Sequence, residues 1–369
     1  MRLASFNVEN LFARPRVFHR GDWSEGAPVL TAYGRVAALL EAPTYTTAIK
    51  KKIVTGLKEL GLAKSDETKF VVLRQNRGRL VKRTAAGPQI AAGGRADWVG
   101  WLELKMQLAS EVCVQNTARV VSELAPDVIA VIEADNRPAL KQFSGDFVPA
   151  APGPGQDYRY VMLIDGNDDR GIDVGIMARG SYPITDMASH VDDVDDAGTI
   201  FSRDCPEFVI RTPAKHNLLV MVNHLKSKGY GGQSESDAKR RRQAQRVAEI
   251  YVRRRKQYPY IAVVGDFNDT PSSAPLAPLF DATDLRDVSS HPAYVNDGIP
   301  GTWGKGYASN HIDFILLSPA LFNRVTSGGT FRAGVWDDRK TPKWQVFDTL
   351  TRAEDAASDH AAVWADVNV

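Results

Sequence analysis

The chain has 369 residues, of which 43% are hydrophobic and 24% charged, the balance of a folded globular protein rather than of a disordered or fibrous one. Its 46 Lys and Arg nearly match its 44 Asp and Glu, so the formal net charge of +2 gives no overall attraction to nucleic acid or membranes. Any site for a polyanion must therefore be a local patch. No stretch of about 18 apolar residues occurs that would span a bilayer.

The cysteines and the N-terminus bear on the cellular compartment. Cys113 and Cys205 lie far apart and have neither metal-ligand nor redox spacing, so we expect no disulfide framework and a reducing compartment. The chain enters a strand-like pattern at Met1, without the features of a signal peptide. We therefore expect a cytoplasmic protein.

Short apolar runs rich in β-branched residues predict buried strands. They fall at 128–132, 158–164, 172–177, 218–223, 261–264, 314–317 and 361–367. Helical spacing of apolar residues predicts helices over 110–124 and 236–255. Strands mixed with helices indicate an α/β or α+β sandwich.

About a hundred residues, 13–108, separate the first strand from the helix at 110–124, far more than a compact connection needs. We interpret this segment as an insertion into one domain that spans residues 1–369. We expect it to contain a basic helix around 49–60, a hairpin over 70–82 that turns at Asn76-Arg77-Gly78, and a flexible Gly-rich loop at 87–94.

Polar residues follow the apolar strands at their ends, where open α/β sheets tend to place ligand sites. Asn7 ends the first strand, and its amide can donate to a phosphate oxygen or accept from a metal-bound water. Glu133 ends the buried strand 128–132, and we expect it to bind Mg²⁺, which is usually held by one or two carboxylates together with phosphate and water. Each residue alone would equally suit a turn or a solvated loop.

Basic residues also flank the strands. Arg170 precedes the strand 172–177, and its planar guanidinium can grip a phosphate, with Asp173 positioning it. The strand 218–223 leads into His224, Lys226 and Lys228, and such a cluster suits an anionic substrate, whereas a lone strand-end histidine is more often structural. We therefore predict that Arg170, Lys226 and Lys228 bind substrate phosphate.

The segment 263–271 carries the most specific signal. Gly265 lets the backbone approach closely, and strand alternation points Asp266 and Asn268 to the same side. A carboxylate and an amide in that arrangement can orient a water molecule and hold the charge that develops on phosphorus. An Asx-rich turn before Pro271 would explain the composition but not the buried strand that leads into it.

Two histidines complete the set. His360 directly precedes the final strand and needs a partner that fixes its tautomer, for which Asp313 is the natural candidate. His311 lies two residues before Asp313, and we interpret it as structural because no feature of the sequence requires an imidazole there to act.

In their order along the chain, these segments resemble the endonuclease/exonuclease/phosphatase superfamily, which has the DNase I-like fold. The resemblance rests on Asn7, Glu133, Asp266 with Asn268, Asp313, and Asp359 with His360. It covers the chain except for the insertion, and its Gly-Asp-Phe-Asn and Ser-Asp-His segments are specific in combination. It implies an α+β fold, a four-layered α/β/β/α sandwich of two mixed sheets flanked by helices.

The resemblance also implies metal-dependent phosphodiester hydrolysis. By position, Glu133 would bind Mg²⁺ or Mn²⁺, and Asn7 and Asp359 would complete the environment of metal and phosphate. Whether one or two metals act stays open.

The catalytic residues implied by the resemblance follow in the same way. Asp266 would orient or deprotonate the attacking water, and Asn268 would hold the transition state. His360, paired with Asp313, would contact the scissile phosphate, and His224 would do so from the opposite wall. Phosphoryl transfer needs in-line positioning and neutralisation of charge on the phosphate oxygens, which a cation, an amide and an imidazolium supply together.

Local charge favours a nucleic acid as the substrate. Basic residues occur at 239–242, 246 and 253–256 in one predicted helix, and the insertion adds Lys50, Lys51, Lys52, Arg74, Arg77, Arg79, Lys82 and Arg83, with Trp98 and Trp101 nearby. Basic residues interleaved with aromatic rings suit a nucleic-acid backbone and its bases. A solvated helix face would explain any one of these runs equally well.

Two alternatives stay open. One is a phosphodiesterase or phosphatase that acts on a lipid or small phosphate ester, which is weakened because we identify no apolar hairpin for docking on a membrane. The other is a non-catalytic binding protein that keeps the fold. The second alternative is disfavoured because each expected catalytic position holds a chemically competent residue.

Overall fold

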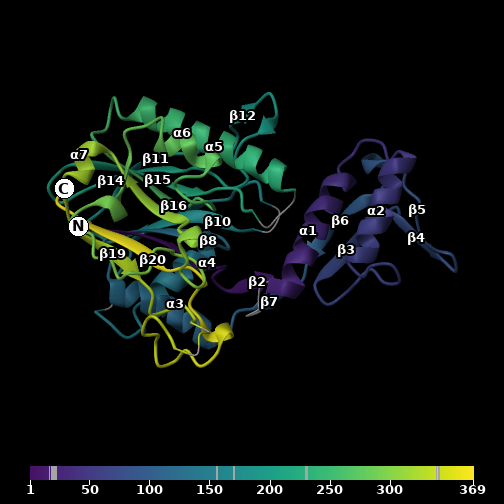
Figure 1. Ribbon diagram of the computed structural model, residues 1–369, viewed down its shortest axis with the longest axis horizontal. Helices are drawn as coiled ribbons and strands as arrows, with labels where there is room; N and C mark the ends of the chain where they lie inside the picture. Colours follow the sequence, from purple (N-terminus) through teal and green to yellow (C-terminus); the bar gives the residue numbers. More distant parts are fainter. Residues whose placement is uncertain are drawn as a thin grey trace. The chain divides into compact units, whose positions relative to one another are not determined.

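The computed structural model describes residues 1–15, 17, 23–154, 157–168, 171–228, 232–337, 339 and 341–369. The chain divides into two compact units (Figure 1). Unit 1 comprises Met1–Phe12, Ala109–Ser227 and Asp237–Val369, and unit 2 comprises Ala13–Leu108 and Lys228–Ser236.

Unit 1 is built on two six-stranded mixed sheets. The first has the order β19-β20-β1-β8-β10-β9, in which β1 and β8 are parallel and the other neighbours antiparallel. Its strands are β1 (Arg2–Asn7), β8 (Val128–Ala134), β9 (Tyr160–Ile164), β10 (Asp173–Ala178), β19 (Val325–Phe331) and β20 (Ala362–Val367).

The second sheet has the order β11-β14-β15-β16-β18-β17, in which β15 and β16 are parallel and the other neighbours antiparallel. Its strands are β11 (Ile184–Ala188), β14 (Glu207–Arg211), β15 (Asn217–His224), β16 (Tyr260–Asp266), β17 (Arg286–Asp287) and β18 (Asp313–Leu317). Each sheet therefore contains one parallel pair near its middle.

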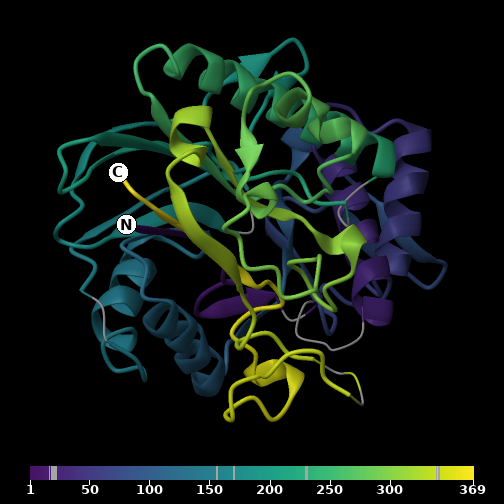
Figure 2. The same ribbon diagram turned by 60° about the vertical axis from the view of Figure 1, so that its left-hand side comes forward.

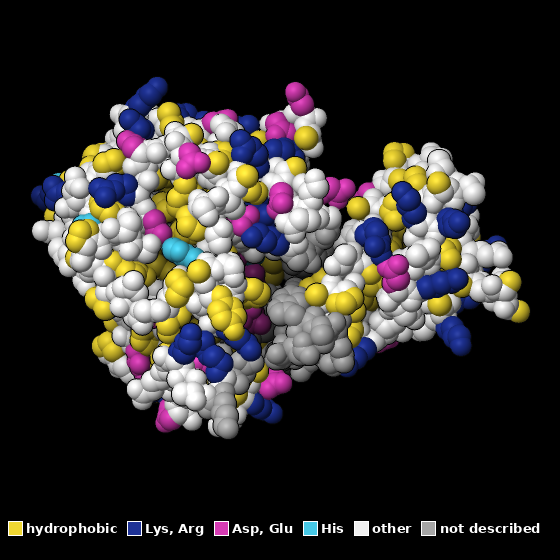
Figure 3. Space-filling model, viewed as in Figure 1, with side chains coloured by type: hydrophobic (Ala, Val, Ile, Leu, Met, Phe, Trp, Pro, Cys, Tyr) yellow, Lys and Arg dark blue, Asp and Glu magenta, His cyan; other side chains and the backbone are white. Residues whose placement is uncertain are grey.

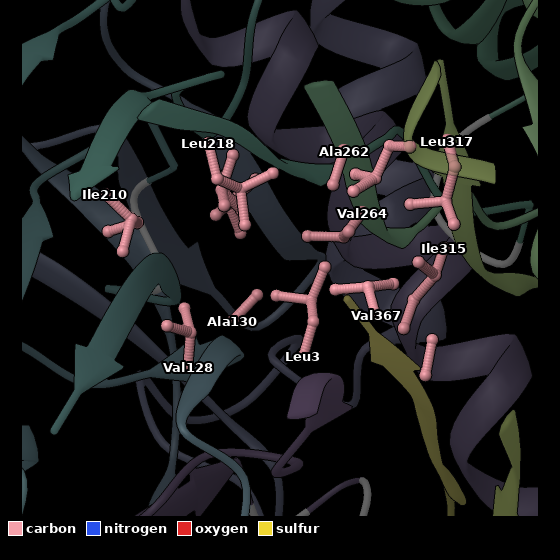
Figure 4. Close-up of a cluster of buried hydrophobic side chains, with 14 of the residues drawn as sticks. Leu3, Val128, Ala130, Ile210, Leu218, Ala262, Val264, Ile315, Leu317 and Val367 are labelled. Carbon is pink, nitrogen blue, oxygen red and sulfur yellow. The ribbon is translucent and has the colours of Figure 1, made fainter. Parts of the chain in front are cut away.

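Strand alternation explains how the layers stack. Val128 and Ala130 of β8 lie in one buried cluster with Ala262 and Val264 of β16, between the two sheets (Figure 4). Ile129 of β8, one residue out of phase, belongs instead to the cluster on the opposite face of its sheet. Because successive side chains of a strand point to opposite faces, strands that are apolar throughout must be covered on both sides.

Helices supply the outer cover. Helix α3 (Glu111–Leu124) packs against the first sheet, and α5 (Gln233–Arg254) against the second. Figures 1 and 2 show these helices on opposite sides of the paired sheets. Ser110 caps α3 by accepting from the Cys113 amide at 3.0 Å, as its residue type favours. The expected four-layered α/β/β/α sandwich is confirmed.

The predicted elements of unit 1 are largely confirmed. All seven predicted apolar strands are present, together with both predicted helices. The strands β11, β14 and β19 were not predicted. Strand β11 is an edge strand with exposed polar residues, and β19 contains Gly328 and Gly329, so neither shows the apolar run that identifies a buried strand.

Unit 2 contains two long helices and three two-stranded ribbons. Its elements are α1 (Trp23–Leu40), α2 (Thr47–Glu59), β2 (Ala13–Pro15), β3 (Val71–Arg77), β4 (Val81–Thr84), β5 (Gly87–Ile90), β6 (Val99–Leu104) and β7 (Met106–Leu108). Both helices share one hydrophobic cluster with the β3–β6 and β4–β5 ribbons, and this cluster includes Val36, Leu57 and Leu102. The predicted basic helix is confirmed as α2.

The hairpin predicted over 70–82 is wrong, because β3 pairs with β6 and β4 pairs with β5. The side-chain oxygen of Gln75 accepts from the amides of Leu80 and Val81 at 2.9 and 3.2 Å, where a hairpin would have backbone ladder bonds. The loop predicted at 87–94 is also wrong in its first half, which forms β5. Local turn residues did not reveal which distant strand each segment pairs with.

Two further expectations concern cysteines and membranes. Cys113 and Cys205 are buried free thiols, which confirms that they form no disulfide. Among the residues that the structure describes, no helix combines the length and the apolar character needed to cross a membrane.

The shorter elements of unit 1 include α4 (Arg137–Gln142), α6 (Ala277–Phe280) and α7 (Pro319–Phe322).

Candidate functional site

The two parallel strand pairs place four polar side chains at one rim of the sandwich. Asn7 and Glu133 lie at the carboxyl ends of β1 and β8, and His224 and Asp266 lie at the carboxyl ends of β15 and β16. Parallel neighbours end at the same edge, so each sheet contributes a pair. His224 is the register partner of Asp266.

Two antiparallel strands bring the remaining side chains to the same rim. Asp313 begins β18 and is the register partner of Asp266 on β16. His360 lies two residues before β20, which pairs with β1. Asp266, Asp313 and His360 are all buried, with fractional exposures of 1%, 3% and 7%. The rim therefore holds carboxylates and an imidazole that are largely removed from water.

Unusual backbone geometry holds this rim in place. Gly265 has φ +134°, and a Cβ there would lie 1.9 Å from the carbonyl oxygen of Asn223, so no other residue fits. Glu133 and Asn268 adopt φ of +65° and +54°, which is uncommon outside glycine. The Asn268 amide donates to the Asp266 carboxylate at 2.8 Å, and this Asx turn accounts for the conformation of Asn268.

His360 and Asp313 form a buried pair. The Nδ1 atom of His360 lies 2.9 and 3.1 Å from the two carboxylate oxygens of Asp313. The Thr302 hydroxyl donates to the same carboxylate at 2.6 Å and thereby holds it in place. Burial alone would lower the pKa of His360, but the carboxylates of Asp313, Asp359 and Asp266 outweigh it and raise that pKa well above its usual range.

Asp266 lies at the centre of the cluster. Its Oδ2 accepts from the Asn7 amide at 3.2 Å and from the Asn268 amide at 3.1 Å, and it lies 3.6 Å from Nε2 of His224. Burial, followed by the neighbouring Asp313 carboxylate, raises the pKa of Asp266 to about 8. The centre of the site is thus short of positive charge.

A metal cation fits this arrangement. Glu133, His224 and Asp266 have potential ligand atoms within 4.8 Å of one another, and so do Asp266, Asp313 and His360. The Glu133 carboxylate lies 3.5 Å from Nε2 of His224. Crowded buried carboxylates are costly unless a cation neutralises them, and carboxylate oxygens are the donors that Mg²⁺ and Mn²⁺ prefer.

Asp359 contacts residues that the sequence analysis did not identify as part of the site. Trp303 donates its indole N–H to the Asp359 carboxylate at 2.7 Å, and its backbone forms a β-bridge with His360. The Asp359 amide donates to the Glu9 carboxylate at 3.1 Å. Thr302 and Trp303 lie ten or more residues before Asp313 in a loop, so no strand pattern pointed to them.

The residues predicted to bind phosphate are less closely defined. Arg170 lies outside the described residues, so its expected contact with Asp173 is not seen. Lys226 is half-buried and Lys228 exposed, both on the segment that follows β15, and their role stays a prediction. His311 stacks on Phe314 at a centroid distance of 4.7 Å, a packing contact of the kind expected for a structural side chain.

The basic run in α5 does not form a row of solvent-facing cations. Arg240 is fully buried, where it binds Asp269 at 3.0 Å and donates to the Lys226 carbonyl at 2.6 Å. Arg242 forms a two-pronged pair with Asp195, and Arg241 donates to a backbone carbonyl. The expectation of a nucleic-acid track along 239–242 is therefore wrong for Arg240, because its charge is used inside the protein.

Residues 105–327 match the family described as Endonuclease/Exonuclease/phosphatase family. No curated protein sequence matches the chain.

Three of the solved structures similar to this chain come from different kinds of protein. Mannosyl-6-phosphatase Bt3783 of Bacteroides thetaiotaomicron has a TM-score of 0.47 and 18% identity, over 69% of this chain and 91% of that one. Truncated Caenorhabditis elegans TDP2 has a TM-score of 0.48 and 14% identity, over 69% and 90%. Beta toxin of Staphylococcus aureus has a TM-score of 0.48 and 16% identity, over 70% and 94%.

Proposed function

Because the chain belongs to the endonuclease/exonuclease/phosphatase family of phosphoester hydrolases, we propose that it is a divalent-metal-dependent nuclease that hydrolyses phosphodiester bonds of DNA or RNA. The observation that carries the proposed chemistry is the buried cluster of Asp266, Asp313 and His360 with Asn7 and Glu133 at its edge. Its charges match the needs of phosphoryl transfer, which are an oriented water and a neutralised phosphate.

The proposed reaction forms a bond between a water oxygen and phosphorus and breaks the bond to the leaving oxygen. Asp266 accepts a proton from the attacking water, since its carboxylate is held by amide donors from Asn7 and Asn268. His360 is the cationic donor to the phosphate, because Asp313 stabilises its protonated form. The Asn268 amide contacts Asp266 and the Leu225 carbonyl, so we assign it to positioning Asp266.

Glu133 is the residue proposed to hold Mg²⁺ or Mn²⁺, with His224 beside it and Asn7 and Asp359 in the surrounding shell. When bound, the cation supplies charge neutralisation on the phosphate and lowers the pKa of bound water. The chain itself contributes a rigid rim. The left-handed backbone at Glu133 and the close approach of the Gly265 backbone to Asn223 fix the carboxylates of Glu133 and Asp266 before substrate binds.

Charge distribution supports a nucleic acid as the substrate. Residues 13–108 contain 17 Lys and Arg against 8 Asp and Glu, whereas the rest of the chain contains 29 against 36. The small net charge of the whole chain therefore conceals a strongly basic unit 2 and an acidic remainder. Figure 3 shows Lys and Arg side chains spread over the visible face of unit 2. A basic module attached to a phosphodiesterase favours a polyanionic substrate.

A substrate panel tests this proposal. Plasmid DNA, single-stranded DNA, RNA, sphingomyelin and bis(p-nitrophenyl) phosphate are incubated with the protein and Mg²⁺ or Mn²⁺. We expect cleavage of DNA or RNA that stops with excess chelator and in His360→Ala. Turnover of sphingomyelin or the small diester without turnover of polynucleotide would replace the nuclease assignment with a lipid or small-ester phosphodiesterase. No turnover of any substrate would reject the catalytic proposal.

A further inference from the structure

The ribbon of β3 and β6 in unit 2 has two different faces. Residues that lie opposite each other in an antiparallel pair share a face. Leu73 lies opposite Leu102, and both are buried in the core of unit 2. One position along, Arg74 lies opposite Trp101, and both are exposed. The outward face of the ribbon therefore presents an aromatic ring beside a guanidinium.

Trp101 is not needed for the core of unit 2. It is 46% exposed, whereas Trp98 on the same segment is 2% exposed and donates its indole N–H to the Tyr45 hydroxyl at 3.0 Å. Val99, opposite Arg77 in the register, is 49% exposed. Val99 and Trp101 lie two residues apart on β6, so both exposed apolar side chains are on the same outward face.

The excess positive charge of unit 2 is not neutralised internally. Glu41, Glu59, Asp66, Glu67 and Glu103 each form an ion pair with an Arg or Lys of the same unit. Within the described part of the chain, no ion pair engages Lys51, Lys52, Lys58, Lys64, Arg77, Arg79 or Lys82. Arg77 and Arg79 flank the turn at Gly78, at the end of the ribbon that carries Val99.

We propose that the outward face of the β3–β6 ribbon binds single-stranded nucleic acid, with a base stacked on Trp101 and backbone phosphates bound by Arg77 and Arg79. This proposal rests on the proposed nuclease function and specifies its substrate as single-stranded. Stacking on an exposed ring needs unpaired bases, and it tolerates any sequence because every base has an aromatic face. Attachment to unit 1 then raises the local concentration of substrate for the catalytic rim.

The chemistry of the face favours a polynucleotide over a lipid surface. Arg74 and Glu103 form a two-pronged ion pair at 2.8 and 3.0 Å on this face. Insertion into a bilayer would desolvate this ion pair at a large cost. A nucleic-acid contact keeps its charged groups in water.

Binding of fluorescein-labelled oligonucleotides to the full chain tests the proposal, with anisotropy measured in excess chelator so that no cleavage occurs. We expect single-stranded DNA or RNA to bind more tightly than the matching duplex. Trp101→Ala should weaken single-strand binding roughly ten-fold, and Trp101→Phe should retain most of the affinity, because a phenyl ring still stacks. Arg77→Ala with Arg79→Ala should reduce the slope of log affinity against log salt by about 1.4.

A charge-matched control removes two exposed cations from unit 1, Lys141→Ala with Arg159→Ala, and should leave affinity and slope near wild type. The proposal is overturned if the control variant loses as much affinity as the Arg77 and Arg79 variant, if Trp101→Ala binds like wild type, or if anionic vesicles bind where oligonucleotides do not. Turnover of bis(p-nitrophenyl) phosphate separates the two proposals. If that turnover persists in Trp101→Ala while single-strand binding is lost, both proposals stand. If wild type turns over neither this diester nor any other substrate of the panel, the catalytic proposal fails independently.

Discussion

Asp313 and His360 meet through both carboxylate oxygens, which lie 3.1 and 2.9 Å from the Nδ1 atom of the imidazole. This contact fixes the ring so that its other nitrogen, Nε2, faces the Asn7 amide at 3.5 Å and the Asp266 carboxylate at 3.9 Å. The imidazole is thereby oriented toward the centre of the rim, and its protonated form is stabilised there.

Replacing Asp313 by Asn tests this relationship. The variant loses the charge that favours protonated His360, so the pKa of His360 falls and the protonated form disappears at lower pH. We expect kcat/KM to fall by roughly 10² or more, with the alkaline limb of the pH–rate profile displaced to lower pH. Thr302→Val, which removes the hydroxyl that holds Asp313, should shift the same limb less. An unchanged profile in Asp313→Asn would mean that His360 does not act as a proton-bearing group.

Metal binding is predicted to depend on Glu133. Glu133→Gln keeps the size of the side chain but removes its charge, and we expect the affinity for Mn²⁺ to fall at least about ten-fold. Titration calorimetry on the resting protein measures this without reference to turnover. Glu111→Gln, at an exposed position in the first turn of α3, is the matched control and should bind Mn²⁺ like wild type. Equal affinity in both variants would remove Glu133 from the metal site.

Asp173 makes the stability of unit 1 depend on pH. Burial raises its pKa from 3.8 to about 6, although the Gly166 amide donates to it at 2.7 Å. A carboxyl group whose pKa is higher in the folded state than in the unfolded state binds more protons in the folded state. The free-energy cost of ionising it in the folded protein therefore does not reduce stability below about pH 4, and this loss of stability grows as pH rises to about 6. At neutral pH the penalty is of the order of 3 kcal/mol.

Asp173→Asn removes that titration while its side-chain oxygen can still accept from Gly166. We therefore expect the variant to gain stability relative to wild type as pH rises from about 4 to 6, and the difference to stay constant above about pH 7. Urea denaturation across this range measures the difference. A difference that does not change with pH would show that Asp173 titrates normally in the folded protein.

Arg240 is predicted to stabilise the protein. Its side chain is fully buried against Asp269, which is itself 3% exposed, so Arg240→Ala removes a cation that pairs with a carboxylate inside the molecule. We expect a loss of about 3–5 kcal/mol in the free energy of unfolding. Arg253→Ala, at an exposed position of the same helix, should change it by less than about 0.5 kcal/mol. Similar small effects in both variants would contradict the buried pair.

Much of the polar rim could be predicted from the sequence for a local physical reason. Consecutive apolar residues indicate a buried strand, and a polar residue directly after them marks the end of that strand. Asn7, Glu133 and Asp266 stand at such positions, Asp313 stands at the start of its strand, and the structure brings all four side chains to one rim. The amphipathic patterns of α3 and α5 identified the covering helices in the same way.

The tertiary structure decided which distant segments meet. Trp303 reaches Asp359, and β3 pairs with β6 rather than with its neighbour β4, although no local pattern specified either contact. The arginines of α5 look alike in sequence, yet Arg240 is buried and Arg253 exposed. Burial, charge pairing and the choice of strand partner depend on contacts between residues that are far apart in the chain. Strand alternation and helical spacing depend on residues that are close in the chain, so only these two features can be recognised in the sequence as local patterns.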